Sequence, residues 1–215
     1  MGLRNRVRRT SNEPGDDIST ILLSALDCVL NGEKAVYASS DLTTGRRFYE
    51  LLRKSDARTP EDLRAKIGDK MYRRKLFEPN SLAANAFARS LRHRLGGSTL
   101  VIAPAPLTVQ GWSQKQYLEF FETLIRTRVQ AVYLNDGWQY SNGCTFEFAV
   151  AQEAGIATFD ADCEPIDRVR GVHLIECAAL ELEAMGIEPI GLRRHQAMVT
   201  ATNKPRSPFD KVNSR

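Results

Sequence analysis

Apolar positions follow two different rhythms along this chain. In some segments they recur every three or four residues, as in amphipathic helices, and in others they form short continuous runs, as in buried strands. Helices are predicted over 17–30, 46–54, 81–95, 113–127, 145–154 and 172–185, and strands over 34–38, 99–103, 129–134 and 156–159. Residues 55–80 are highly charged, and their pattern indicates only a helix start at Thr59-Pro60-Glu61-Asp62.

The alternation of strands and helices predicts an α/β protein with a doubly wound parallel sheet. We expect one domain over residues 17–190, because 215 residues suit a single core with length to spare. Residues 1–16 are basic and predicted to be a flexible tail. Residues 191–215 are polar, basic and interrupted by two prolines, so they are predicted to form a tail or an arm.

Composition narrows the possible classes of protein. A hydrophobic share of 42% is enough for a packed core, while no apolar run approaches the roughly 20 residues of a membrane span. Together with the absence of a signal-peptide pattern, this predicts a cytoplasmic protein. The net charge of +4 comes largely from the two ends and argues only weakly for nucleic-acid binding, so a nucleic-acid-associated protein is kept as an outside alternative. The four scattered cysteines and three histidines show no metal-ligand spacing, so we expect no metal and no disulfide framework.

The segment from Asn135 to Glu147 is the most informative part of the sequence. It follows an apolar run and is rich in small polar residues, and a helix is predicted to begin near Thr145 with Glu147 in its first turn. Ligands of open α/β sheets bind at the carboxyl ends of the strands, and helix N-termini attract anions. The segment therefore predicts a place where a phosphate and a reactive carboxylate meet.

The loop after the first strand offers a second set of polar groups. Tyr37 lies near the end of that strand, hydroxyl residues and Asp41 follow, and Gly45 precedes the helical pair Arg46-Arg47. Backbone donors, hydroxyls and guanidinium groups suit a phosphate, although neither a Walker loop nor a Rossmann fingerprint is present. An ordinary polar turn with two solvated arginines is the alternative.

Taken together, Tyr37 to Arg46 and Gly137 to Glu147 resemble the nucleoside 2-deoxyribosyltransferase-like superfamily, in its nucleotide N-glycosidase or CMP-hydrolase-like branch. The resemblance implies a flavodoxin-like sheet with helices on both faces. It also implies cleavage of the bond between base and sugar by a glutamate nucleophile, which corresponds to Glu147 within Gly143-Cys144-Thr145-Phe146-Glu147.

The resemblance assigns further roles residue by residue. Ser141 stands six residues before the glutamate, where transferases carry aspartate and nucleotide hydrolases carry a serine that contacts the 5′-phosphate. A hydroxyl donates to a phosphate that a carboxylate would repel, so a 5′-monophosphate is the favoured substrate. The expected phosphate site comprises Ser141, Gly143, Arg46 and Gly45, and the catalytic group comprises Glu147, Asp136, Asp41 and Tyr37, with Trp138 against the base.

One position departs from the family pattern. Gln130 occupies the place where relatives carry an aspartate, so Asp136 or Asp41 would have to manage the proton. Simpler interpretations also remain open. Glu147 would complement the helix dipole in any case, Ser141 and Asp136 suit turns, and Trp138 suits packing.

The expected function is hydrolysis of a nucleoside 5′-monophosphate to free base and (deoxy)ribose 5-phosphate, with no cofactor. Two alternatives are a nucleoside deoxyribosyltransferase and a non-catalytic nucleotide-binding or sensing domain on the same fold. The resemblance further implies a homodimer or a higher homo-oligomer.

Overall fold

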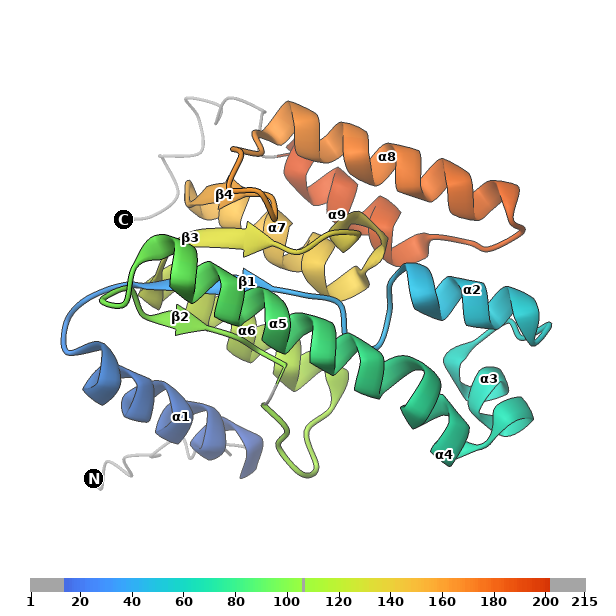
Figure 1. The fold of residues 1–215 in the computed structure, drawn as a ribbon, viewed down its shortest axis with the longest axis horizontal. Coiled ribbons are helices and arrows are strands. Elements are labelled where there is room, and N and C mark those ends of the chain that lie inside the picture. The colour runs from blue at the N-terminus through green and yellow to red at the C-terminus, as the bar shows by residue number, and fades with distance from the viewer. Residues whose placement is uncertain (1–13, 106, 202–215) are drawn as a thin grey trace, which may run out of the picture.

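A parallel sheet between helices forms the protein, as the computed structural model of residues 14–105 and 107–201 shows (Figure 1). Its elements in chain order are α1 (Pro14–Leu30), β1 (Ala35–Ser39), α2 (Arg46–Lys54), α3 (Pro60–Ile67), α4 (Asp69–Tyr72), the π-helix η1 (Arg73–Phe77), α5 (Glu78–Leu95), β2 (Val101–Ile102), α6 (Gln114–Arg128), β3 (Val129–Leu134), the 3₁₀-helix η2 (Trp138–Tyr140), α7 (Asn142–Ala154), β4 (Ala157–Phe159), α8 (Arg168–Ala184) and α9 (Ile190–Ala201).

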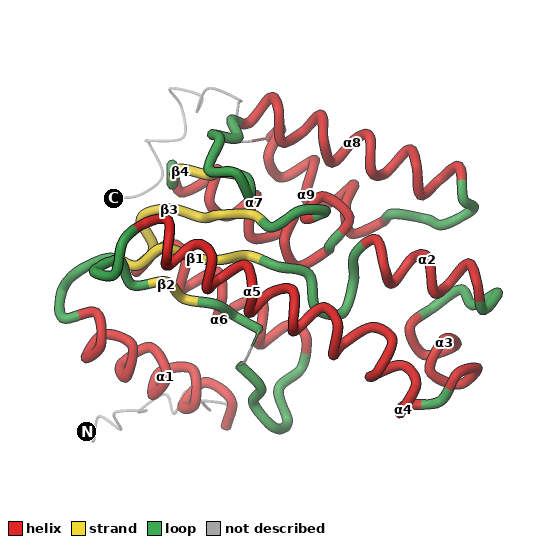
Figure 2. Tube along the Cα trace, in the orientation of Figure 1, coloured by secondary structure: helices red, strands yellow, loops and turns green. Residues whose placement is uncertain are grey.

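The sheet has four parallel strands in the order β2-β1-β3-β4, which confirms the predicted flavodoxin-like α/β fold in a single domain (Figure 2). Tyr37 of β1 lies beside Val132 of β3, and Ser39 lies beside Leu134. The carboxyl ends of β1 and β3 are therefore neighbours. The loop after β1 and the turn after β3 leave the sheet from the same edge.

Side chains of β1 alternate between the two faces of the sheet, as a strand requires. Val36 and Ala38 belong to a core cluster with Phe87, Ala88 and Leu91 of α5. Tyr37 belongs to the larger cluster on the other face, which includes side chains of α6 and α7. Helices thus cover both faces, as predicted, and Tyr37 and Ser39 point to the α7 side.

The structure corrects the expectation of a C-terminal tail from residue 191. Residues 190–201 form α9, whose Leu192, His195 and Val199 are buried at helical spacing against the large core cluster. The many polar residues between them face outward and concealed this short apolar stripe. Residues 202–215 of the expected tail, and residues 1–13 of the expected N-terminal tail, lie outside the described part of the chain; α1 already begins at Pro14.

Several element boundaries also differ from the predictions. The unassigned charged segment forms α3, α4 and η1, and α5 begins at Glu78 rather than at 81. The strand predicted over 99–103 keeps only two paired residues in β2. Most important for the site, α7 begins at Asn142, three residues earlier than expected, because Ser141 caps it. Among the described residues, no helix is long and apolar enough to cross a membrane.

Candidate functional site

Glu147 is the centre of the polar groups that gather where β1 meets α7. Its side chain lies in a buried position, with 7% of the residue exposed. The Tyr37 hydroxyl donates to its Oε1 at 2.7 Å, and the Ser39 hydroxyl donates to its Oε2 at 2.5 Å. Tyr37 and Ser39 are two positions apart in β1, so the period of the strand aims both hydroxyls at the same carboxylate.

Burial dominates the electrostatics of Glu147. It raises the pKa of the carboxyl from its ordinary 4.5 to about 7, although the hydrogen bonds from Ser39 and Tyr37 pull in the opposite direction. Burial, and then the negative charge of Glu147, raise the pKa of Tyr37 well above its usual value, so its hydroxyl stays a donor. Near neutral pH the carboxyl therefore exists in both ionised and protonated forms.

Cys144 lies one helical turn before Glu147 and is buried. Burial and the charge of Glu147 raise the pKa of its thiol. A thiol held in its neutral form is a poor nucleophile. Glu147 is thus the stronger candidate for a reacting group, and Cys144 is a small buried residue.

The first turn of α7 lies against the β1–α2 loop. The Ser141 hydroxyl accepts the backbone N–H of Cys144 at 3.4 Å and caps the helix. The Thr44 hydroxyl accepts the N–H of Asn142 at 3.0 Å and lies 3.4 Å from the Ser141 hydroxyl. A side chain added at Gly143 would meet only the Ser141 hydroxyl, at 3.8 Å, so there is room for a methyl group at this position. The β1–α2 loop and the first turn of α7 are thus in contact, at a helix N-terminus that favours anions.

Asp41 and Gly45 shape the base of the β1–α2 loop. Gly45 has φ 136°, and a Cβ there would lie 2.3 Å from the Asp41 carboxylate, so only glycine fits. Burial raises the pKa of Asp41, while the charge of Arg47 opposes that rise. The negative charge of Asp41 also contributes to the raised pKa of Cys144, so Asp41 lies within electrostatic reach of the Cys144 thiol.

Asp136, the other candidate for managing the proton, and Gln130, the position that departs from the pattern of the resemblance, are both exposed. Asp136 is exposed in the turn after β3. Gln130 is exposed near the start of β3, before the pairing of Val132 with Tyr37. Of the acidic candidates for managing the proton, Asp41 is the partly buried one, and its charge reaches Cys144.

Arg46 lies at the rim of the site and is already engaged. Its guanidinium donates to the Tyr140 hydroxyl at 2.8 Å, lies 4.6 Å from the centre of the Tyr140 ring and is 3.9 Å from Glu181. The Tyr140 hydroxyl in turn donates to Glu181. The neighbouring Arg47 is exposed, and its guanidinium donates to the side-chain oxygen of Asn80 at 2.7 Å.

Trp138 takes the packing role that the sequence left open. It is 4% exposed, and its ring centre lies 4.9 Å from that of Phe148 in the core. The structure therefore gives Trp138 no open face on which a base could stack.

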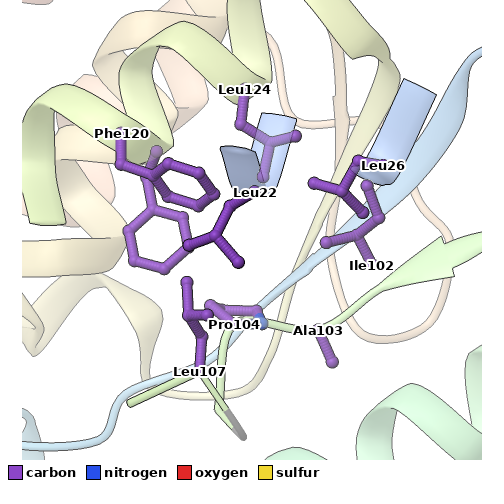
Figure 3. A pocket seen from close by; sticks show the side chains of 9 residues that line it. Leu22, Leu26, Ile102, Ala103, Pro104, Leu107, Phe120 and Leu124 are labelled. Atoms are coloured by element: carbon purple, nitrogen blue, oxygen red, sulfur yellow. The ribbon is translucent and has the colours of Figure 1, made fainter. Parts of the chain in front are cut away.

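A separate cavity of about 300 Å³ lies between α1, β2 and α6 (Figure 3). The side chains that line it are all apolar, and the ring of one of them, Phe121, meets Tyr37 edge-on at 6.1 Å. The lining comprises Leu22, Leu26, Ile102, Ala103, Pro104, Leu107, Phe120, Phe121 and Leu124. With no side-chain donor or charge in its wall, this cavity does not suit a phosphate.

The sequence interpretation counted the hydroxyls of the β1–α2 loop as a group and did not single out Ser39 and Thr44. Ser39 had a usable signal, because it is two positions after Tyr37 and shares its face of β1. Thr44 had none, since its contacts with Ser141 and Asn142 depend on how a loop folds across about a hundred residues of sequence. Among the described residues, no cluster of three or more histidine, cysteine or acidic side chains is arranged to hold a metal ion.

Comparison with known proteins gives one match. Residues 77–160, which run from the end of η1 through β4 and include Ser141 and Glu147, match the family model of a domain of unknown function (DUF4406). The match covers less than half of the chain and leaves out β1 with Tyr37 and Ser39. No curated protein and no solved structure matches the chain. What is established is a parallel, flavodoxin-like α/β fold with a partial match to a family of unknown function; the nucleoside 2-deoxyribosyltransferase-like resemblance stays a prediction.

Proposed function

We propose that this protein hydrolyses the N-glycosidic bond of a nucleoside 5′-monophosphate, with Glu147 as the nucleophile. The observation that carries the proposal is the buried Glu147 carboxylate, held by two hydroxyl donors beside an open helix N-terminus. A glycosidase of the retaining type needs such a fixed carboxylate, and a nucleotide needs an anion site within one sugar's length of it.

The chemistry follows from these groups. The ionised Glu147 attacks C1′ of the sugar, the bond to the base breaks, and the base leaves with a proton supplied by a second acid. Asp41 is our candidate for that acid because it lies in the β1–α2 loop against Gly45, and burial favours its protonated form by raising its pKa. Asp41, ionised after the first step, then takes a proton from a water molecule as its oxygen attacks C1′ of the glycosyl ester. The ester bond breaks, the sugar phosphate is released, and both the Glu147 carboxylate and the Asp41 acid are restored. Tyr37 and Ser39 hold the carboxylate in place and favour its ionised form.

The 5′-phosphate would occupy the space above the first turn of α7. Ser141 and the amide of Gly143 supply neutral donors there, and Gly45 lets the β1–α2 loop approach closely. Arg46 supplies the positive charge, provided that its guanidinium turns from Glu181 toward the phosphate. An anion at this position also gains from the α7 dipole.

The test is incubation of the purified protein with a panel of all common ribonucleoside and deoxyribonucleoside 5′-monophosphates, with free bases measured by chromatography. Wild type should release base from at least one nucleotide, and Glu147→Gln should abolish release. The matched control is Glu153→Gln on the same helix, whose carboxylate pairs with Arg126 instead, and it should leave release unchanged. If wild type releases no base from any member of the panel, the proposal fails.

A second candidate function is a non-catalytic nucleotide-binding or sensing domain. Both carboxylate oxygens of Glu147 already accept hydrogen bonds, which also suits a purely structural carboxylate. This candidate predicts nucleotide binding by calorimetry without release of base. Transfer of the sugar to an added free base would instead identify a transferase. We further propose a homo-oligomer, which light scattering on the purified protein tests.

A further inference from the structure

Helix α9 lies against the first turn of α7, on the side away from Glu147. The side chain of Asn142 packs so closely on the α9 backbone that a Cβ at Gly191 would lie 2.2 Å from the Asn142 Oδ1 atom. That position therefore requires glycine while the two helices stay in contact. Thr145 and Glu147 are two residues apart, which places them on roughly opposite sides of the helix.

His195 of α9 makes the second contact with this turn. Its Nδ1 atom lies 2.9 Å from the Thr145 hydroxyl, and that hydroxyl is also 2.9 Å from the backbone carbonyl oxygen of Ser141. The Thr145 hydroxyl has one hydrogen. If it donates to the Ser141 carbonyl, it must accept from His195, and the hydrogen bonds then run from α9 through α7 to the cap residue.

Packing fixes the imidazole in this arrangement. His195 is 7% exposed, and its ring meets Phe146 edge-on at 5.6 Å. Burial lowers the pKa of His195 to about 4, so at neutral pH the ring is uncharged and has one N–H to give. A neutral, enclosed histidine that is hydrogen-bonded to the Thr145 hydroxyl is suited to holding that neighbour in place.

We infer that Gly191 and His195 are positioning residues, which hold the first turn of α7 against the β1–α2 loop and so fix both the Ser141 cap and the direction of Glu147. The close Gly191–Asn142 approach and the His195–Thr145–Ser141 hydrogen bonds carry this inference. An effect of these residues on catalysis rests on the proposed function. Their effect on the geometry of the first turn of α7 is independent of that function and can be measured without substrate.

The experiment compares three variants of α9 in the full-length protein. His195→Leu removes the donor and keeps an apolar side chain, whereas His195→Asn keeps an N–H close to the Nδ1 position. Val199→Ala is the control, because Val199 is fully buried on the same helix one turn further from the contact. Amide hydrogen exchange across residues 142–147 and the pKa of Glu147 by carbon NMR are the readouts.

We expect His195→Leu to speed exchange of the first-turn amides of α7 about tenfold more than Val199→Ala does, as loss of one hydrogen bond would. The pKa of Glu147 should move in His195→Leu and stay near the wild-type value in Val199→Ala. His195→Asn should restore both readouts most of the way. Where base release is measurable, kcat should follow the same order.

The inference is overturned if His195→Leu and Val199→Ala speed exchange of these amides equally, since α9 would then contribute only general stability. Failure of His195→Asn to restore them overturns it too. Should His195→Leu not fold, Gly191→Ala provides the same reading, because its added methyl group must displace Asn142. Absence of base release in wild type would refute the proposed function alone and leave the exchange result to decide this inference.

Discussion

Replacing Tyr37 with phenylalanine removes one hydroxyl from the candidate site and keeps the ring. Tyr37 is fully buried, so the phenylalanine ring fills the same space and leaves no large cavity. The change deletes the hydrogen bond of 2.7 Å to Glu147 Oε1, which stabilises the ionised carboxylate. We therefore expect the pKa of Glu147 to rise above about 7 in this variant.

The magnitude follows from the strength of a hydrogen bond to a charged group. Such bonds contribute about 1.5–3 kcal/mol, which corresponds to a rise of about 1–2 pH units at 1.36 kcal/mol per unit. Carbon NMR of selectively labelled glutamate, titrated without substrate, measures the shift. Tyr49→Phe is the control. Tyr49 is another buried tyrosine, on α2, and its pKa is raised by burial and not by the charge of Glu147.

An unchanged pKa of Glu147 in Tyr37→Phe would refute this reasoning, because it would mean that the hydroxyl does not distinguish the two forms of the carboxyl. An equal shift in Tyr49→Phe would refute it as well, since the effect would then come from altered packing. A drop in pKa would contradict even the sign of the expected interaction.

Three other predictions concern stability. Folding raises the pKa of Glu147 from 4.5 to about 7, so the free energy of unfolding should fall as the pH rises from 4.5 to 7. Urea unfolding at both pH values should show wild type losing ~3 kcal/mol more than Glu147→Gln. The same pH dependence in both proteins would contradict this. Gly45→Ala would bring a methyl group into Asp41 at a backbone φ of 136°, so calorimetry should show a lower Tm and a loss of about 1–3 kcal/mol in the free energy of unfolding. The control is Gly32→Ala, which also has a positive φ but no neighbour within 4 Å, and it should cost clearly less. Ser141→Ala removes the cap of α7 and should cost about 1 kcal/mol in urea unfolding; an unchanged midpoint would show that the cap is dispensable.

The fold was predictable because its signals are local. Short apolar runs such as Thr99 to Ala103 indicate strands even where, as in β2, only two residues pair. Their alternation with helices determines the parallel sheet. The position of Glu147 also followed from local signals, because an apolar run, a polar turn and a helix start are adjacent in sequence.

The missed features depend on contacts between distant segments. The first backbone N–H of α7, at Asn142, finds its partner in the hydroxyl of Thr44, which lies in the distant β1–α2 loop. Burial of Trp138 depends on Phe148 facing it from the next helix. α9 presents only three buried residues among arginines and polar side chains, so its docking surface becomes visible only once α7 and α8 are in place.

The two outer strands of the sheet have a consequence for solubility. β2 has only two residues and is followed closely by Pro104, and β4 has three, with Phe159 bridged to Pro165 where the chain turns back. Proline lacks the N–H that an incoming strand would need. Long exposed edge strands present unpaired N–H and C=O groups to which a strand of another chain can pair. Short edge strands next to prolines present few such groups. This protein should therefore resist strand-to-strand aggregation at high concentration.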